Sequence, residues 1–147
     1  MADPDVSPNI GLLAFLVARD METRVMEGLA SAGYDDITLA QSRAFQRVGP
    51  DGTRVTDLAE QARITKQTAV FLVNQLERAG YVERVVDPTD ARARLVRLAG
   101  RGRALVEVAR RLEAEVEQRW ADHLGARDTA SLRRILTSLR EITDPYA

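Results

Sequence analysis

The sequence predicts a mainly helical (α+β) protein in which a small central unit with a short β-sheet lies between helical ends. Apolar residues recur at helical spacing over residues 10–32 and 105–120, and again near the C-terminus. Two runs rich in β-forming residues flank a turn between these ends. We expect six helices and three strands, arranged as an N-terminal helix at 1–35, a central unit at 36–100 and C-terminal helices at 101–147.

Composition excludes several classes of function. The net charge of -1 argues against a general polyanion binder, although residues 63–103 carry nine Lys and Arg against four acids. The chain has no cysteine and one histidine, which excludes disulfides and thiol chemistry and disfavours a metal site, so we expect no cofactor. Residues 1–9 lack the basic start of a signal peptide, and the longest apolar run, 12–18, is too short to span a membrane. The expected location is the cytoplasm.

The helical ends carry more apolar surface than the central unit can cover. One apolar stripe runs along residues 10–32, and Leu12, Phe15 and Leu16 add a second apolar side. A helix at the edge of a small domain cannot easily bury two sides within its own subunit, so the ends predict a homodimer interface. An ordinary core helix is the alternative for residues 10–32. The two stripes consist of Ile10, Leu13, Ala14, Val17, Met21, Val25 and Leu29 near the N-terminus, and of Leu132, Ile135, Leu136, Leu139 and Ile142 near the C-terminus.

The central unit begins with a short helix. Thr38 and Gln41 have the spacing of a capping box, which predicts a helix that starts at residue 39 and ends before the breaker cluster at 49–52. Residues 53–55 are expected to form a short strand.

Two further helices follow, joined by a tight turn. Thr56 is the expected N-cap of a helix at 57–62, and residues 63–64 form the turn. Thr65 can then cap a second helix, which Gly80 ends. This arrangement is typical of the helix-turn-helix motif of DNA-binding proteins.

The second of these helices has two chemically different sides. One is an apolar stripe suited to a core, formed by Ala69, Leu72, Val73 and Leu76. The other could read base edges in the major groove, where glutamine suits adenine, threonine can donate or accept, and a phenyl ring can touch only a thymine methyl group or a sugar. A lysine in the first turn suits a phosphate, and a simply solvated polar side is the alternative. The side chains concerned are Lys66, Gln67, Thr68, Phe71 and Gln75.

An arginine-rich hairpin is predicted next. Residues 87–90 read Asp-Pro-Thr-Asp, which matches a type I turn between two short strands. Arg92 and Arg94 follow the turn, and a projecting arginine suits the narrow, negative minor groove of DNA. Asp90 is expected to hold Arg92 in an ion pair. A charged hairpin tip by itself is usually just exposed to solvent. When the hairpin follows a helix-turn-helix in the chain, it is typical of a wing.

These segments resemble the MarR (multiple antibiotic resistance regulator) family of winged helix-turn-helix transcription factors. The matching stretches are Val-Thr-Asp-Leu-Ala-Glu at 55–60, Thr-Lys-Gln-Thr at 65–68, Leu-Glu-Arg-Ala-Gly-Tyr-Val at 76–82 and Asp-Pro-Thr-Asp-Ala-Arg at 87–92. The resemblance implies a homodimer with flanking dimerisation helices, bound to a pseudo-palindromic site in double-stranded DNA. The contact residues that it implies are Thr65, Lys66, Gln67, Thr68, Phe71, Gln75, Asp90 and Arg92.

The sequence also departs from the family pattern. Arg63 stands where members often have glycine, Ala91 where they often have arginine, and Ala99 where they often have threonine. Phe71 replaces a residue that is often basic, so its ring either contacts DNA or packs inside.

The resemblance further implies a repressor that a small aromatic or amphipathic anion releases from DNA, by entering a cleft between the dimer helices and the DNA-binding lobe. Met21, Trp120 and His123 are the expected ligand residues, with core or surface roles as the alternative. No catalytic motif marks the chain as an enzyme. The competing function is a winged-helix module that acts through protein–protein contacts without sensing a ligand.

Overall fold

The computed structural model describes residues 7–146 and is mainly helical, with one two-stranded sheet. The elements follow the order α1 (Ile10–Ser31), α2 (Leu39–Phe45), α3 (Val55–Ala62), α4 (Lys66–Arg78), β1 (Val82–Asp87), β2 (Asp90–Leu98), α5 (Gly100–Leu124) and α6 (Ala126–Thr143). The predicted fold class is therefore confirmed.

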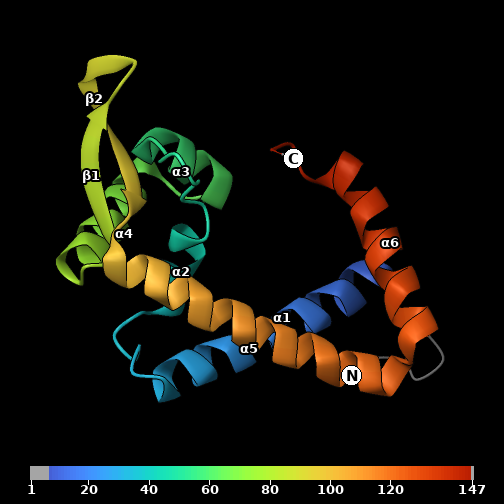
Figure 1. The fold of residues 1–147 in the computed structure, drawn as a ribbon. Coiled ribbons are helices and arrows are strands. Elements are labelled where there is room, and N and C mark those ends of the chain that lie inside the picture. Colours follow the sequence, from blue (N-terminus) through green and yellow to red (C-terminus); the bar gives the residue numbers. More distant parts are fainter. Residues whose placement is uncertain (1–6, 147) are drawn as a thin grey trace.

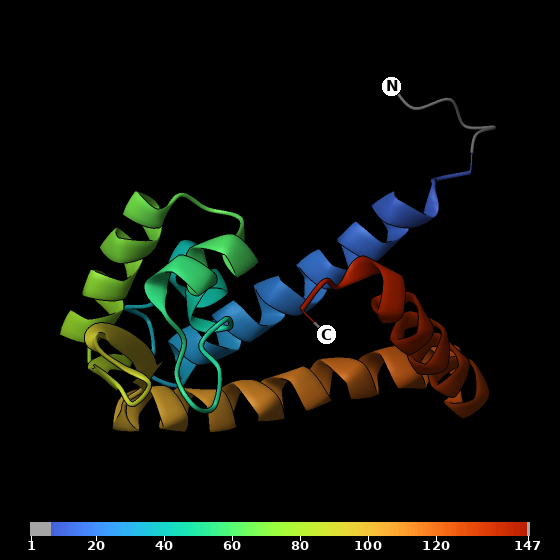
Figure 2. The ribbon, with the colours of Figure 1, turned by 90° about the horizontal axis from the view of Figure 1, so that it is seen from above.

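A small lobe and a helical frame make up the molecule. Figure 1 shows α2, α3, α4 and the β1–β2 hairpin gathered at one end of the long helix α5, with α1 alongside α5. Helix α6 begins at the other end of α5, and its C-terminal end turns back towards α3 (Figures 1 and 2), where Tyr146 shares a pocket with Arg54 and Glu60. No helix within residues 7–146 has the length and apolar character needed to cross a membrane.

The lobe is held together by the apolar stripe of α4. Ala69, Leu72, Val73 and Leu76 are all buried, as their helical spacing predicted. They pack in one cluster with Leu58 of α3, Val96 of β2 and residues from α1, α2 and α5. The core therefore fixes which side of α4 faces solvent.

Several predicted boundaries were wrong in detail. The strand expected at 53–55 is a single bridge between Thr53 and Val96, because Val55 already begins helix α3. Thr56 is not the N-cap: Arg54 occupies that position without a side-chain hydrogen bond. Asp128 was expected to cap the last helix, but it lies inside the first turn of α6, and Gly125 occupies the N-cap position.

The start of α5 is clamped against the end of α4. A Cβ atom at Gly102 would lie 2.0 Å from the carbonyl oxygen of Tyr81, so only glycine allows this approach. The neighbouring Arg101 bonds Asp36 at 2.7 Å and the carbonyl oxygen of Ala79 at 2.8 Å. Arg101 also lies 4.4 Å from the centre of the buried Tyr81 ring. These contacts join the lobe to the long helix α5.

Large apolar side chains remain exposed on α1 and α6. On α1 they occupy the N-terminal half and include Ile10, which is 79% exposed, and Phe15. No residue of α6 is buried, although its stripe from Leu132 to Ile142 is apolar. The first half of α1 is therefore not an ordinary core helix within one chain, which was the alternative for residues 10–32.

Candidate nucleic-acid interface

The outer side of α4 is open to solvent. Lys66, Gln67, Thr68 and Phe71 are all exposed, so the ring of Phe71 does not pack inside. Thr65 caps the helix by accepting a hydrogen bond from the Thr68 amide at 3.1 Å, and its hydroxyl pairs with the Thr68 hydroxyl at 2.9 Å. The first turn of α4 is thus pre-ordered before it meets any partner.

The turn between α3 and α4 depends on Arg63. This residue adopts φ 54° and ψ 45°, the left-handed conformation in which glycine is most comfortable. The Ile64 amide then donates to the carbonyl oxygen of Ala59 at 3.0 Å, which closes the end of α3. Arginine at this position therefore supports the same turn as the glycine of the family pattern.

Gln75 is only half-exposed, and one of its polar atoms is occupied. Its Oε1 accepts a hydrogen bond from Nε2 of Gln41 in α2, at 2.9 Å. Gln41 completes the predicted capping box with Thr38, so that box is confirmed. The link from Gln41 to Gln75 was missed because the two residues are 34 positions apart and no local pattern connects them.

The wing is the antiparallel β1–β2 hairpin, with Asp87 at its turn. Asp87 is only 5% exposed and accepts hydrogen bonds from the hydroxyl and the amide of Thr89, at 2.7 and 2.8 Å. Arg54 pairs with the other carboxyl oxygen at 2.6 Å. The two bonds from Thr89, followed by that from Arg54, lower the pKa of Asp87 from 3.8 to about 2.

The ion pair expected between Asp90 and Arg92 is not formed. Oδ1 of Asp90 instead accepts the backbone amide of Arg92 at 3.0 Å. Within the part of the chain that the structure describes, the Arg92 guanidinium makes no hydrogen bond. Arg94 donates weakly to the carbonyl oxygens of Ala91 and Ala93, at 3.4 and 3.2 Å. Both arginines are exposed on the wing.

Three other basic residues, in the wing and at the start of α5, form bonds within the protein. Arg84 bonds Glu77 and Asn74, Arg97 bonds Glu83, and Arg103 bonds the carbonyl oxygen of Leu98.

Sequence reasoning missed Arg78, which is exposed and lies seven residues after Phe71 on the same side of α4. It also missed Arg54, the partner of the wing carboxylate.

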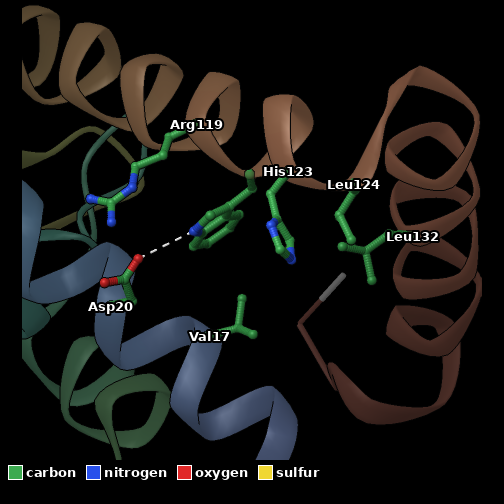
Figure 3. Close-up of a pocket in the computed structure, with 7 residues that line it drawn as sticks. Val17, Asp20, Arg119, His123, Leu124 and Leu132 are labelled. Atoms are coloured by element: carbon green, nitrogen blue, oxygen red, sulfur yellow. Dashed lines mark hydrogen bonds between the residues drawn. The ribbon is translucent and has the colours of Figure 1, made fainter.

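Two of the three predicted ligand residues share a pocket. Trp120 and His123 of α5, with Arg119, line a pocket of about 370 Å³ together with Val17 and Asp20 of α1 and Leu132 of α6 (Figure 3). The indole nitrogen of Trp120 donates to Asp20 at 3.2 Å. Met21 does not line this pocket.

A separate hollow occupies the predicted position between the helical frame and the lobe. Its volume is about 480 Å³, and its walls include Leu29 of α1, Phe45 of α2 and Leu105 of α5, with Arg110 and Glu113 also in the lining. None of the three predicted ligand residues reaches it. The expected residues and the expected cleft are therefore two different places in the fold.

A family model and several solved structures point to the same family. A family model described as the MarR family matches residues 35–93, which is most of the lobe. E. coli MarR in its reduced form is 23% identical, covering 92% of this chain and 98% of its own, with a TM-score of 0.76. A Mycobacterium tuberculosis MarR family protein in complex with salicylic acid is 27% identical, with coverage of 92% and 98% and a TM-score of 0.67.

A structure with bound nucleic acid is also among the similar proteins. A mutant of S. aureus MepR bound to an oligodeoxyribonucleotide is 24% identical, again with coverage of 92% and 98%, and its TM-score is 0.61. No curated protein matches the sequence.

Proposed function

Because this chain is a MarR-family winged helix-turn-helix transcription regulator and not an enzyme, we propose that it binds operator DNA as a homodimer and acts as a ligand-released repressor. In this proposal α4 enters the major groove and the wing enters the adjacent minor groove. The regulated site lies on cytoplasmic DNA and is close to palindromic, because a two-fold symmetric dimer meets two equivalent half-sites.

One observation supports the DNA-binding proposal above the others. Helix α4 and the wing, whose strand β2 carries Arg92, belong to the same lobe (Figure 1), and α5 is clamped to that lobe through Gly102 and Arg101. A helix matches the width of the major groove, and an arginine suits a narrow minor groove. We assign Thr65, Lys66, Gln67, Thr68, Phe71 and Gln75 to the major groove or its phosphates, and Asp90, Arg92 and Arg94 to the wing contact.

The exposed apolar sides of α1 and α6 support the homodimer. An apolar stripe at helical spacing on each of two neighbouring elements is a surface that a second copy can cover. The N-terminal half of α1 and the start of α6 lie away from the wing (Figure 2), whereas the C-terminal half of α1 packs into the lobe through Leu29. Pairing there would leave α4 and the wing of each copy free for DNA.

The pocket around Trp120 supports the effector proposal. Arg119 and His123 can pair with a carboxylate, and the Trp120 ring and Leu132 offer apolar surface for an aromatic ring (Figure 3). Because α6 forms one wall, a bound ligand would change how α6 sits on α5. Such a ligand shifts the dimer away from DNA only if it binds the DNA-free spacing of the lobes more tightly.

The decisive experiment is binding to the DNA that flanks the protein's own gene. Fluorescence anisotropy at several salt concentrations should show specific binding that weakens steeply as salt rises, because phosphate contacts release counterions. Arg92→Ala should reduce the affinity strongly, whereas Arg111→Ala, which removes an equal charge from the exposed side of α5, should not. Absence of salt-dependent duplex binding would favour a module that acts through protein partners.

A further inference from the structure

Phe71 is an apolar ring in the middle of a polar surface. It is 60% exposed and lies one helical turn after Gln67 and one turn before Gln75. The core stripe of α4 faces the other way, and the apolar side chains of the proposed dimer surface belong to α1 and α6 and not to α4. Neither the core nor the proposed dimer contact therefore accounts for this ring.

The orientation of the Gln75 amide follows from a chain of hydrogen bonds. The Thr38 amide can only donate, so it fixes Oε1 of Gln41 as its acceptor, at 2.9 Å. The other end of that side chain is then an NH₂ group, which donates to Oε1 of Gln75 at 2.9 Å. Gln41 is only 8% exposed and is held in place by its capping box.

This series of hydrogen bonds leaves only the NH₂ group of Gln75 free. Its oxygen faces Gln41, so its NH₂ group is the end that can reach outward as a donor. A two-bond contact with adenine needs both the oxygen and the NH₂ group of a glutamine. The bond to Gln41 turns the Gln75 oxygen towards α2, which disfavours that contact and leaves the NH₂ group as the outward-facing end.

Resting on the proposed DNA binding, we propose that Phe71 and Gln75 together recognise one thymine in each half-site. In the major groove thymine presents an acceptor, O4, beside its C5 methyl group. A phenyl ring and an outward-facing NH₂ group one turn apart on a helix match that pair of features. Gln41, which does not face the groove, is the positioning residue that gives Gln75 its donor character.

The first test removes only the methyl group. In a DNA site selected by the wild-type protein, each thymine is replaced in turn by uracil. At one position per half-site we expect a loss of about fourfold in affinity, which corresponds to exposing one buried methyl-sized group. Phe71→Ala should bind thymine and uracil equally at that position, and Phe71→Leu should retain part of the difference. Val70 is an exposed apolar residue beside the proposed contact, and Val70→Ala should keep the full difference in affinity between thymine and uracil.

The second test reverses the hydrogen bond. In Gln41→Glu one carboxylate oxygen can still accept from Thr38, but the other can only accept, so the Gln75 amide should rotate and turn its oxygen outward. That oxygen suits the amino group of 5-methylcytosine, which keeps the methyl group beside a donor instead of an acceptor. The wild type should prefer thymine to 5-methylcytosine by about fivefold, the value of one hydrogen bond, and Gln41→Glu should reverse this order. Gln46→Glu adds the same charge to the end of α2 and should leave the order unchanged.

The outcomes separate this inference from the proposed function. Failure of the wild type to bind any duplex specifically would overturn the proposed function. Specific binding in which no thymine is sensitive to uracil, or in which Phe71→Ala keeps that sensitivity, would overturn the thymine contact alone. An unchanged base order in Gln41→Glu would overturn the positioning role of Gln41. Circular dichroism of each variant confirms that it is folded.

Discussion

Arg54 and Asp87 join the wing to the helix-turn-helix, with the Arg54 Nη2 atom 2.6 Å from Oδ2 of Asp87. Arg54 is the residue before α3, and Asp87 ends β1. The same carboxylate accepts both hydrogen bonds from Thr89. One side chain thus closes the wing turn and sets the direction of the hairpin relative to α3.

Removal of the Arg54 guanidinium should therefore disorder the wing without unfolding the lobe. We expect Arg54→Met, which keeps most of the aliphatic stem, to lower DNA affinity and to speed amide exchange at residues 87–92. Arg97→Met is the matched control, because Arg97 also pairs on the hairpin, with Glu83, but between its own two strands. Equal effects of the two substitutions would show that the link between wing and lobe has no special role.

The wing carboxylate also predicts a dependence of stability on pH. The pKa of Asp87 is about 2 in the folded protein against 3.8 for the free side chain, so the folded state binds fewer protons. Its contribution to stability is complete above the unfolded value and is lost as the pH falls from about 4 towards 2. Chemical unfolding in this window should show a steeper loss of stability for the wild type than for Asp87→Asn.

Substitution of Thr89 provides an independent check on what lowers the pKa of Asp87. Its hydroxyl is the largest contributor to the lowered pKa of Asp87, ahead of its own amide and of Arg54. In Thr89→Val the pKa of Asp87, followed by carboxyl NMR, should rise towards 3.8. An unchanged pKa would assign the shift to the two remaining donors, the amide of residue 89 and the Arg54 guanidinium.

Local signals in the sequence predicted most of the elements but few of the links between them. The apolar stripe of α4 and the capping box of Thr38 and Gln41 depend on spacing within one helix, so periodicity finds them. The bond from Gln41 to Gln75 joins two helices and leaves no such trace. It alters the chemistry of a base-reading candidate that sequence alone treated as a free amide.

The error at Asp90 has a similar physical origin. Opposite charges two residues apart on a strand suggested an ion pair with Arg92. An aspartate in a turn, however, readily accepts the backbone amide two residues later, and Asp90 does so at 3.0 Å. The turn therefore uses the carboxylate and leaves the Arg92 side chain free.

At Gly102, substitution by alanine should change the free energy of unfolding in the direction opposite to the one that helix propensity predicts. Alanine normally stabilises a helix relative to glycine by up to about 1 kcal/mol. At Gly102 the added Cβ would lie 2.0 Å from a backbone oxygen of Tyr81, so Gly102→Ala should destabilise the protein by roughly 1 to 3 kcal/mol. Gly100→Ala is the control, since only the end of the Arg103 side chain lies within 4 Å, at 3.8 Å. Gly102→Ala should lower the melting temperature, whereas Gly100→Ala should raise it or leave it unchanged.

The apolar stripe of α6 predicts that a charge placed on it prevents dimerisation and weakens operator binding. Leu136 is 50% exposed in one chain and lies in the middle of that stripe. Leu136→Lys would place a charge where the second copy is expected to pack, so sedimentation should show a monomer. Because a linked pair of half-sites multiplies the effective concentration of the second lobe, the monomer should bind the whole operator on the order of 100-fold more weakly. Thr137→Lys adds the same charge one residue further around the helix, off the stripe, and should remain dimeric. A Leu136→Lys protein that stays dimeric and keeps its affinity would place the dimer contact elsewhere than on α6.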